Sequence, residues 1–306
     1  MRAGAAASVA ALALLLGACR SPAERSASTT TSTVSVAVAA AYGRPTLLAR
    51  IESSDIDENS GLAASRRVPG LVWAHNDSGD VPLLYCVDRA GRSCGVWSVT
   101  AAKARDWEDM AAGPGPVAGE RYLYMGDIGD NRGDQPAVTI YRVPEPVANP
   151  GDGSSKARPR RTAPAEAIRL RYEDGPHDAE ALFVHPATGD VYVVAKGIGA
   201  AAVYKAGGGV LRRVGTVALG AGEWVTGGDI SPDGRRVALC TYFGGYELTL
   251  PAGSDSVFDD VWGALAVPVD LGDRAQGESV AYGLDGRSLV ASSEGSPAPL
   301  YEVKRR

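Results

Sequence analysis

The 306-residue sequence is poor in histidine, in long apolar runs and in excess positive charge, and each shortage excludes a class of protein. Only three histidines occur, His75, His177 and His185, and none has the spacing of a zinc or copper ligand. The net charge of −5 argues against nucleic-acid binding, which requires a basic face. The sequence contains no Gly-x-Ser-x-Gly elbow, no phosphate-binding P-loop and no defensible Ser–His–Asp arrangement, so the common hydrolase and nucleotide-binding motifs are missing.

The one long apolar run, residues 5–16, is too short to span a bilayer. It follows Arg2 and ends in Leu16-Gly17-Ala18-Cys19, which resembles a bacterial lipoprotein signal. The resemblance implies that residues 1–18 are removed and that Cys19 is lipidated; an ordinary secretory signal is the alternative. Residues 19–45 are rich in Ser, Thr and Ala and read as a flexible tether. We therefore expect an exported protein, anchored by lipid to the outer face of a bacterial membrane.

The remainder, residues 46–306, contains one short motif five times. The five copies are residues 58–63, 106–111, 178–183, 226–231 and 276–281. Aligned on their third position, they give the column Ser60, Glu108, Glu180, Gly228 and Glu278. Internal repeats of this period indicate a solenoid or a propeller.

Each unit resolves into strand-like segments, four in each of the first four units and three in the fifth, and the first segment of each unit starts at the fourth residue of the motif. Residues 45–51 supply a strand that would complete the fifth unit. The pattern predicts an all-β, five-bladed β-propeller closed by its N-terminal strand. Residues 144–164 are rich in Pro, Gly and Arg and predict a surface loop inserted in the second blade. A six-bladed propeller, with a blade hidden in this insertion, and a β-sandwich are the alternatives.

The innermost strand of each propeller blade lines a central channel, so the column aims Glu108, Glu180 and Glu278 at one axis. Three converging carboxylates stay ionised only if a cation neutralises them. Oxygen ligands without His or Cys select Ca²⁺. We therefore expect Ca²⁺ on the axis. The alternative is that the glutamates bind water and strand-end amides without a metal.

The column is similar to that of the calcium-activated nucleotidase (apyrase) family of five-bladed propellers. The resemblance rests on residues 59–62, 107–110, 179–182, 227–230 and 277–280 and on the blade count. It implies that Ser60, Glu108, Glu180 and Glu278 are the Ca²⁺ ligands. The family has a Ser where this sequence has Gly228, so a water or a carbonyl would take that place.

Loops on the same face as the column carry further candidates for chemistry. Asp77, Asp127, Lys196 and Glu294 are the catalytic candidates, as cation, base or ligands of a second ion. Ligand-binding candidates are Asp80, Asp130, Asn131, Arg132 and Tyr242. Solvated loop charges and Asx turns are the alternative interpretation of these residues.

Three functions remain open, and whether the protein is an enzyme is among the open questions. The favoured one is a surface-tethered module that binds a small-molecule or protein ligand on an acidic, Ca²⁺-binding face. A Ca²⁺-dependent phosphohydrolase resembling the nucleotidases is the first alternative. A glycoside hydrolase is the second, with Trp73, Trp107 or Tyr242 as a sugar platform.

Three cysteines follow Cys19. Cys86 and Cys94 flank a hairpin-like turn, and export permits oxidation, so we predict a disulfide between them, with two free thiols as the alternative. Cys240 lies in a buried-strand pattern and reads as an inert core thiol.

Overall fold

Strands dominate the part of the chain that the computed structural model describes, residues 41–306 apart from 78, 80 and 253–256. Strands account for 49% of the structure and helix for 2%, so the all-β prediction is confirmed. Within the described residues the helical element is one 3₁₀ helix, η1 (Phe258–Gly263). The predicted signal peptide, Cys19, most of the tether and Asp80 lie outside the described residues.

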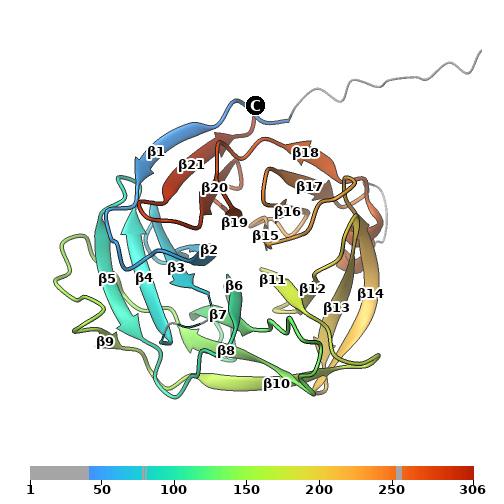
Figure 1. Ribbon diagram of the computed structural model, residues 1–306, viewed down its shortest axis with the longest axis horizontal. Coiled ribbons are helices and arrows are strands. Elements are labelled where there is room, and N and C mark those ends of the chain that lie inside the picture. The colour runs from blue at the N-terminus through green and yellow to red at the C-terminus, as the bar shows by residue number, and fades with distance from the viewer. Residues whose placement is uncertain (1–40, 78, 80, 253–256) are drawn as a thin grey trace, which may run out of the picture. The chain divides into compact units, whose positions relative to one another are not determined.

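The strands form four hydrogen-bonded sheets (Figure 1). The first contains β2 (Asn59–Ala64), β3 (Leu71–Asn76), β4 (Leu83–Asp88), β5 (Ser93–Ser98) and β9 (Arg160–Arg161). The largest contains β6 (Trp107–Pro114), β7 (Arg121–Asp127), β8 (Val138–Pro144), β10 (Glu166–Tyr172), β11 (Ala179–Val184), β12 (Val191–Ala195), β13 (Ala200–Gly207) and β14 (Val210–Ala218). The third contains β15 (Gly227–Ile230), β16 (Arg236–Cys240), β17 (Gly245–Thr249) and β18 (Val267–Val269). The fourth contains β19 (Gly277–Tyr282), β20 (Ser288–Ser293), β21 (Pro299–Lys304) and β1 (Thr46–Arg50).

The innermost strands surround a common centre in a propeller-like arrangement (Figure 1). Strand β2 contacts β6, β6 contacts β11, β11 contacts β15, β15 contacts β19, and β19 contacts β2 again. All residues of these strands are buried except the last one of β6. Each repeated motif therefore begins one strand of this inner ring.

The two ends of the described chain meet in one sheet, as predicted. Strand β1 pairs antiparallel with β21, and Thr46 lies opposite Glu302. The pairing covers the outer edge of a sheet whose other strands come from the end of the chain, which leaves that edge less open to association.

The insertion at residues 144–164 is mostly loop, but it also pairs with the first sheet. Its strand β9 runs parallel to β5, with Trp97 opposite Arg160. The hydroxyl of Ser154 accepts a hydrogen bond from the Val96 amide over 2.8 Å. Within the described residues the insertion contributes no sheet of its own.

Tryptophan rings fill the core between the first sheet and β6–β8. Trp73 and Trp107 have 0% and 1% of their surface exposed. The indole of Trp73 donates to Glu145, and that of Trp107 donates to the Lys103 carbonyl. Neither ring can stack on a sugar at the surface, so Tyr242 is left as the aromatic candidate of the glycosidase interpretation.

The predicted disulfide is not formed. Cys86 and Cys94 are free, buried thiols, and Cys240 is a free, buried thiol as well. Cys86 lies opposite Gly95, and the next pair is Val87 with Ser93, so Cys94 is the extra residue of a β-bulge. The bulge puts Cys94 out of the directly opposed position that the prediction assumed, yet the two thiols still lie close enough for each to shift the pKa of the other.

Candidate functional site

Every residue of the motif column is the second residue of an inner strand. Ser60, Glu108, Glu180, Gly228 and Glu278 hold this position in β2, β6, β11, β15 and β19. The strands thus begin about two residues earlier than the sequence pattern indicates. The column lies on the ends of rigid, buried strands, close to the loops but not in them.

A break in strand register accompanies each column residue that has a side chain. The pairing of the inner strand with its neighbour shifts between Asn59 and Gly61, between Trp107 and Asp109, between Ala179 and Ala181, and between Gly277 and Ser279. A β-bulge turns the side chain of the extra residue away from its regular direction. The bulges therefore explain how residues of buried strands present polar side chains at one point.

Gly228 is different because β15 pairs with β16 in regular register. A Cβ atom at residue 228 would lie 2.4 Å from a ring carbon of Phe183 and 2.6 Å from the Ala238 carbonyl oxygen. The position thus faces packed protein. Gly228 is a site of close packing. The column has no side chain at this position because packed neighbours leave no room for one.

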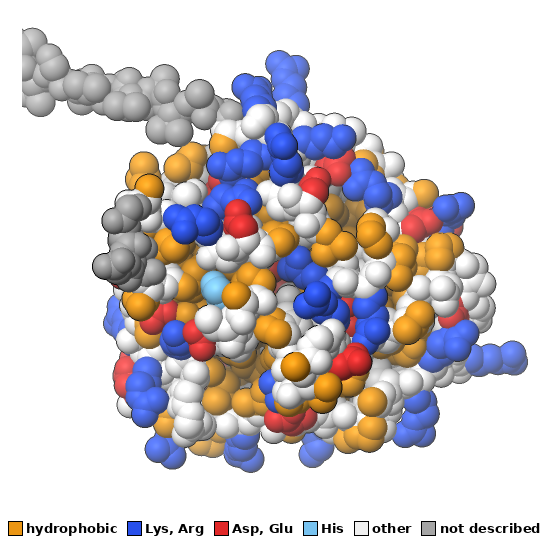
Figure 2. Space-filling view, turned by 180° about the vertical axis from the view of Figure 1, so that it is seen from behind, with side chains coloured by type: hydrophobic (Ala, Val, Ile, Leu, Met, Phe, Trp, Pro, Cys, Tyr) orange, Lys and Arg blue, Asp and Glu red, His pale blue; other side chains and the backbone are white. Residues whose placement is uncertain are grey.

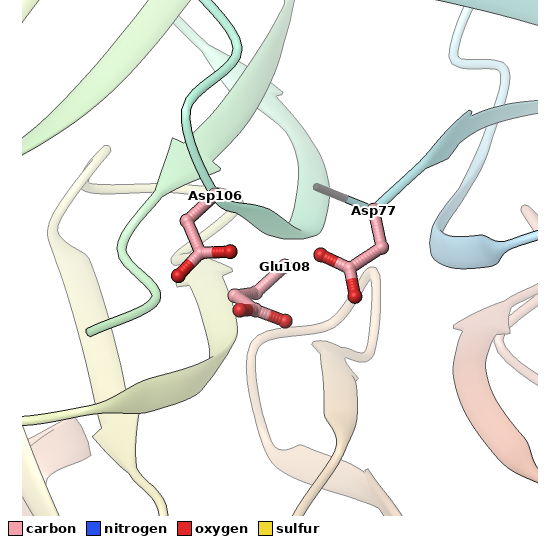
Figure 3. A group of neighbouring side chains, drawn as sticks. All are labelled: Asp77, Asp106 and Glu108. Atoms are coloured by element: carbon pink, nitrogen blue, oxygen red, sulfur yellow. The ribbon is translucent and has the colours of Figure 1, made fainter. Parts of the chain in front are cut away.

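Five carboxylates meet around Glu108. Its side chain belongs to two groups, one with Asp77 and Asp106 and one with Asp178 and Glu180, and within each group the oxygens lie within 4.8 Å of one another. Figure 3 shows Asp106, which precedes β6, and Glu108, in β6, turned toward Asp77, which follows β3. Glu108 is shared by both groups, so it is the centre of the cluster.

Backbone contacts hold the aspartates of this cluster in place. The Asp127 carboxylate accepts a hydrogen bond from the Asp106 amide over 2.9 Å. The Asp178 carboxylate accepts one from the Asp130 amide over 2.7 Å. Asp127, a predicted catalytic residue, therefore fixes the loop that carries Asp106.

Gly129 makes room for the crowded oxygens. A Cβ atom here would lie 2.1 Å from Glu108 Oε1 and 2.4 Å from Asp106 Oδ2. The two carboxylates therefore press against bare backbone, which a larger residue would prevent.

Burial and mutual repulsion set the protonation of the cluster. Burial, followed by the charges of Glu180, Asp77 and Asp106, raises the pKa of Glu108 to about 11. Burial and the carboxylate of Asp77 also raise the pKa of Asp106. Without a cation, Glu108 is protonated at neutral pH.

Lys196 follows β12 and places its ammonium group on Glu180. Burial alone would lower the pKa of Lys196, but the Glu180 carboxylate outweighs burial and raises it. Burial raises the pKa of Glu180, and the Lys196 ammonium opposes that rise. Lys196, a predicted catalytic residue, is thus a cation paired with the acidic cluster.

Glu278 lies outside both groups of three carboxylates. Its Oε1 accepts a hydrogen bond from the Gln276 amide over 3.0 Å, whereas its Oε2 is buried and has no hydrogen-bond partner among the described residues. Burial raises the pKa of Glu278 to about 8, and the Glu180 and Glu294 carboxylates add to the rise. A buried carboxylate oxygen without a donor is a place where a cation would be stabilised.

Ser60 is linked to the cluster by a hydrogen bond to the backbone of Glu108. Its hydroxyl donates to the carbonyl of Glu108 and so ties β2 to β6 at the column. The structure thus joins Ser60, Glu108 and Glu180 directly, with Glu278 farther along the ring.

The predicted ligand-binding residues lie at the edge of the site. The Asp130 carboxylate accepts hydrogen bonds from the amides of Asp134 and Gln135, as expected of a turn. Asn131 and Arg132 are exposed and line a hollow of about 410 Å³ beside Asp106. Tyr242 packs edge-on against Trp224, with ring centres 5.9 Å apart.

Asp106 and Asp178 are cluster members that the column alignment did not include. Both stand two residues before a column glutamate, in Asp106-Trp107-Glu108 and Asp178-Ala179-Glu180. The repeated Asp-x-Glu spacing is the sequence signal that could have identified them.

Comparisons with known proteins give likenesses in fold alone. No protein-family model matches the chain, and no curated protein matches it. One similar solved structure is a chain of the mitotic checkpoint complex, at 15% identity and a TM-score of 0.38, with 78% of this chain and 62% of that chain covered. Another is Kuenenia stuttgartiensis hydrazine synthase, at 10% identity and a TM-score of 0.43, with 81% of this chain and 83% of that one covered. Neither likeness bears on function.

Among the described residues, no helix has the length and apolar character needed to cross a membrane.

Proposed function

We propose that this chain is an exported, lipid-anchored five-bladed propeller that binds Ca²⁺ at one mouth of its channel and uses that face to bind a ligand. The site would be formed by the first residues of the inner strands and by the loops next to them.

Five inner strands that contact one another in a closed cycle support the five-blade count. The eight-stranded sheet supports it too. Its halves, β6–β7–β8–β10 and β11–β14, join only where β10 runs parallel to β14 over two residue pairs. Each half has four strands, as a single blade does.

The observation that carries the Ca²⁺ proposal is the position of Glu108 in two carboxylate groups at once. The donors are hard oxygens from Asp and Glu, which Ca²⁺ prefers. The unpartnered Oε2 of Glu278 is a second, independent sign of a cation at this mouth. Asp77, Asp106, Glu108, Asp178 and Glu180 would hold the ion, which would compensate their negative charge.

A binding role suits the surroundings of the cluster better than catalysis does. Asp127 is engaged in holding the Asp106 loop, and Lys196 is paired with Glu180. Beside them, Tyr242 and the 81% exposed Phe243 line a hollow of about 210 Å³ with Ala275 and Gln276. A metal next to an exposed aromatic hollow is suited to hold a ligand that combines oxygen donors with an apolar part.

Phosphoester hydrolysis is the second candidate, and the double membership of Glu108 favours it. Two cations that share one carboxylate could bind the attacking and leaving oxygens of a phosphoryl group. The resemblance to calcium-activated nucleotidases implies the same class of reaction.

Calorimetric titration of the full chain with Ca²⁺ tests the primary proposal. We expect one or two saturable sites in the unmodified protein and loss of binding in Glu108→Gln. The matched control is Glu120→Gln, which changes an exposed glutamate that pairs with Arg67. Saturable binding that survives Glu108→Gln, or no binding at millimolar Ca²⁺, would refute the site.

The same preparations separate binding from hydrolysis. Release of phosphate from nucleoside diphosphates that chelator abolishes and Glu108→Gln eliminates would establish the enzyme. Ca²⁺ binding without such turnover would favour the ligand-binding role.

A further inference from the structure

The opposite end of the inner ring carries the opposite charge. Turns that follow the inner strands enclose a cavity of about 220 Å³. Its lining is Arg66, the end of β6 from Ala112 to Pro114, Arg121, Pro186, Pro232 and Leu284. The end of β6 and the turns that follow the other four inner strands contribute to this lining, so the cavity is at the end of the inner strands away from the acidic cluster. Lys and Arg side chains gather near the middle of the molecule when it is seen from behind (Figure 2).

Arg66 is held in this cavity with most of its hydrogen-bonding capacity unused. Its backbone amide donates to Glu145 over 3.1 Å, which fixes the turn. Its side chain is only 12% exposed, yet the guanidinium makes no hydrogen bond within the described part of the chain. None of its nitrogen atoms is among the fully buried atoms without a partner, so its N–H donors remain open to an acceptor that enters the cavity.

The carboxylate next to Arg66 is that of Asp229, but it does not accept a hydrogen bond from the guanidinium. The two groups are 3.8 Å apart, which is beyond hydrogen-bond distance. The Asp229 carboxylate instead accepts hydrogen bonds from the amides of Ile230 and Tyr282, over 2.8 and 2.9 Å. Its charge offsets part of the Arg66 charge but leaves the guanidinium N–H groups without a partner.

Arg121 adds a second guanidinium to the same cavity. No ion pair or hydrogen bond engages its side chain in the described residues. Glu120, the residue before Arg121, forms an ion pair with Arg67 over 2.7 Å. Its carboxylate is therefore already engaged by another arginine. Pro114, Pro186, Pro232 and Leu284 supply low-polarity walls, which strengthen the field of the two arginines.

We propose that this basic mouth is a binding site for a small oxyanion, a phosphate or carboxylate group, held between Arg66 and Arg121. Planar guanidinium groups bind both kinds of group through paired hydrogen bonds. The site is independent of Ca²⁺, because the acidic cluster lies at the other end of the inner strands.

Titration of the full chain in the presence of chelator tests this proposal. Inorganic phosphate and acetate serve as separate probes, with binding followed by nuclear magnetic resonance shifts. We expect saturable binding with a dissociation constant on the order of 1 mM for at least one probe. The stronger probe identifies the chemistry of the natural group.

Three variants locate the site. Arg66→Met and Arg121→Met should each weaken binding by about tenfold or more, because each removes charge-assisted hydrogen bonds. Arg169→Met, which changes an exposed arginine outside the cavity lining, should leave the affinity unchanged. Arg121 is exposed, so its variant keeps the test valid if Arg66→Met does not fold.

Absence of saturable binding for both probes would overturn the proposal. Unchanged affinity in Arg121→Met, or anion binding that appears only with Ca²⁺, would overturn it too. The last result would place the anion on a metal at the acidic mouth.

Discussion

The carboxylate of Asp109, in β6, accepts a hydrogen bond from the backbone amide of Gly228, in β15, over 3.1 Å. The same carboxylate accepts bonds from the amides of Met110 and Leu182, over 2.7 and 3.0 Å. One buried side chain thus joins three of the five inner strands. Asp229 makes a similar link to β19 through the amide of Tyr282.

Replacing Asp109 by Ala should therefore destabilise the whole ring. The change leaves three buried amides without an acceptor, and we expect a loss of about 2–4 kcal/mol in the free energy of unfolding. For a domain of this size, that loss lowers the melting temperature by roughly 5–15 °C. Denaturant unfolding and calorimetry measure both quantities. Asp134→Ala, at an exposed loop position, is the control, and an equally small effect in the two variants would contradict the structural role.

Gly228→Ser tests whether this position is a missing ligand or a packing site. The added Cβ meets Phe183 and the Ala238 carbonyl, so we expect a loss of about 1–3 kcal/mol in stability. Because β15 has no bulge at this point, the serine hydroxyl should not reach the cluster, and Ca²⁺ affinity should stay the same. Gly153→Ser, where a Cβ meets nothing within 4 Å, is the matched control. A clear gain in Ca²⁺ affinity would show that residue 228 faces the ion.

The repeated motif predicted the inner strands and the closing strand because apolar alternation and turn residues are local signals. Two of the three glutamates that it aligned, Glu108 and Glu180, lie together in one carboxylate group. The four bulges were not predictable, because register depends on the partner strand as much as on the strand itself. The same reason explains why the bulge at Cys94 was not predicted. In the sequence, Asp109 and Asp229 are simply polar residues next to the column. Their hydrogen bonds to neighbouring inner strands depend on how the strands pack, which the sequence does not give.

The pH dependence of the acidic mouth follows from Glu278 and Glu108. Their folded-state pKa values, about 8 and about 11, lie above the ordinary value of 4.5. The metal-free folded protein therefore holds protons that the unfolded chain has released. The stability from Glu278 is full below about pH 4.5 and is lost as the pH rises through 8.

In chelator, the melting temperature should thus fall as the pH rises from about 4.5 to about 8, the interval between the unfolded and folded pKa values of Glu278, and Ca²⁺ should reverse the fall. Ca²⁺ must displace protons, so its affinity should rise with pH by about tenfold per unit for each proton released. Calorimetric titration in buffers of different ionisation enthalpy counts those protons. Binding with no proton release would show that the cluster is ionised before the metal arrives.

Lys196 should weaken Ca²⁺ binding, since its ammonium already compensates Glu180. A divalent ion at the cluster must either displace that ammonium or share the site with it, and like charges a few ångströms apart repel. Lys196→Gln keeps a polar side chain of similar length and removes the charge, so we expect Ca²⁺ affinity to rise by about tenfold. The control is Lys205→Gln, which removes the same charge from a lysine that pairs with Asp190 and Asp259. If the affinity falls in Lys196→Gln but not in Lys205→Gln, Lys196 helps to hold the carboxylates in place, and the competition is excluded.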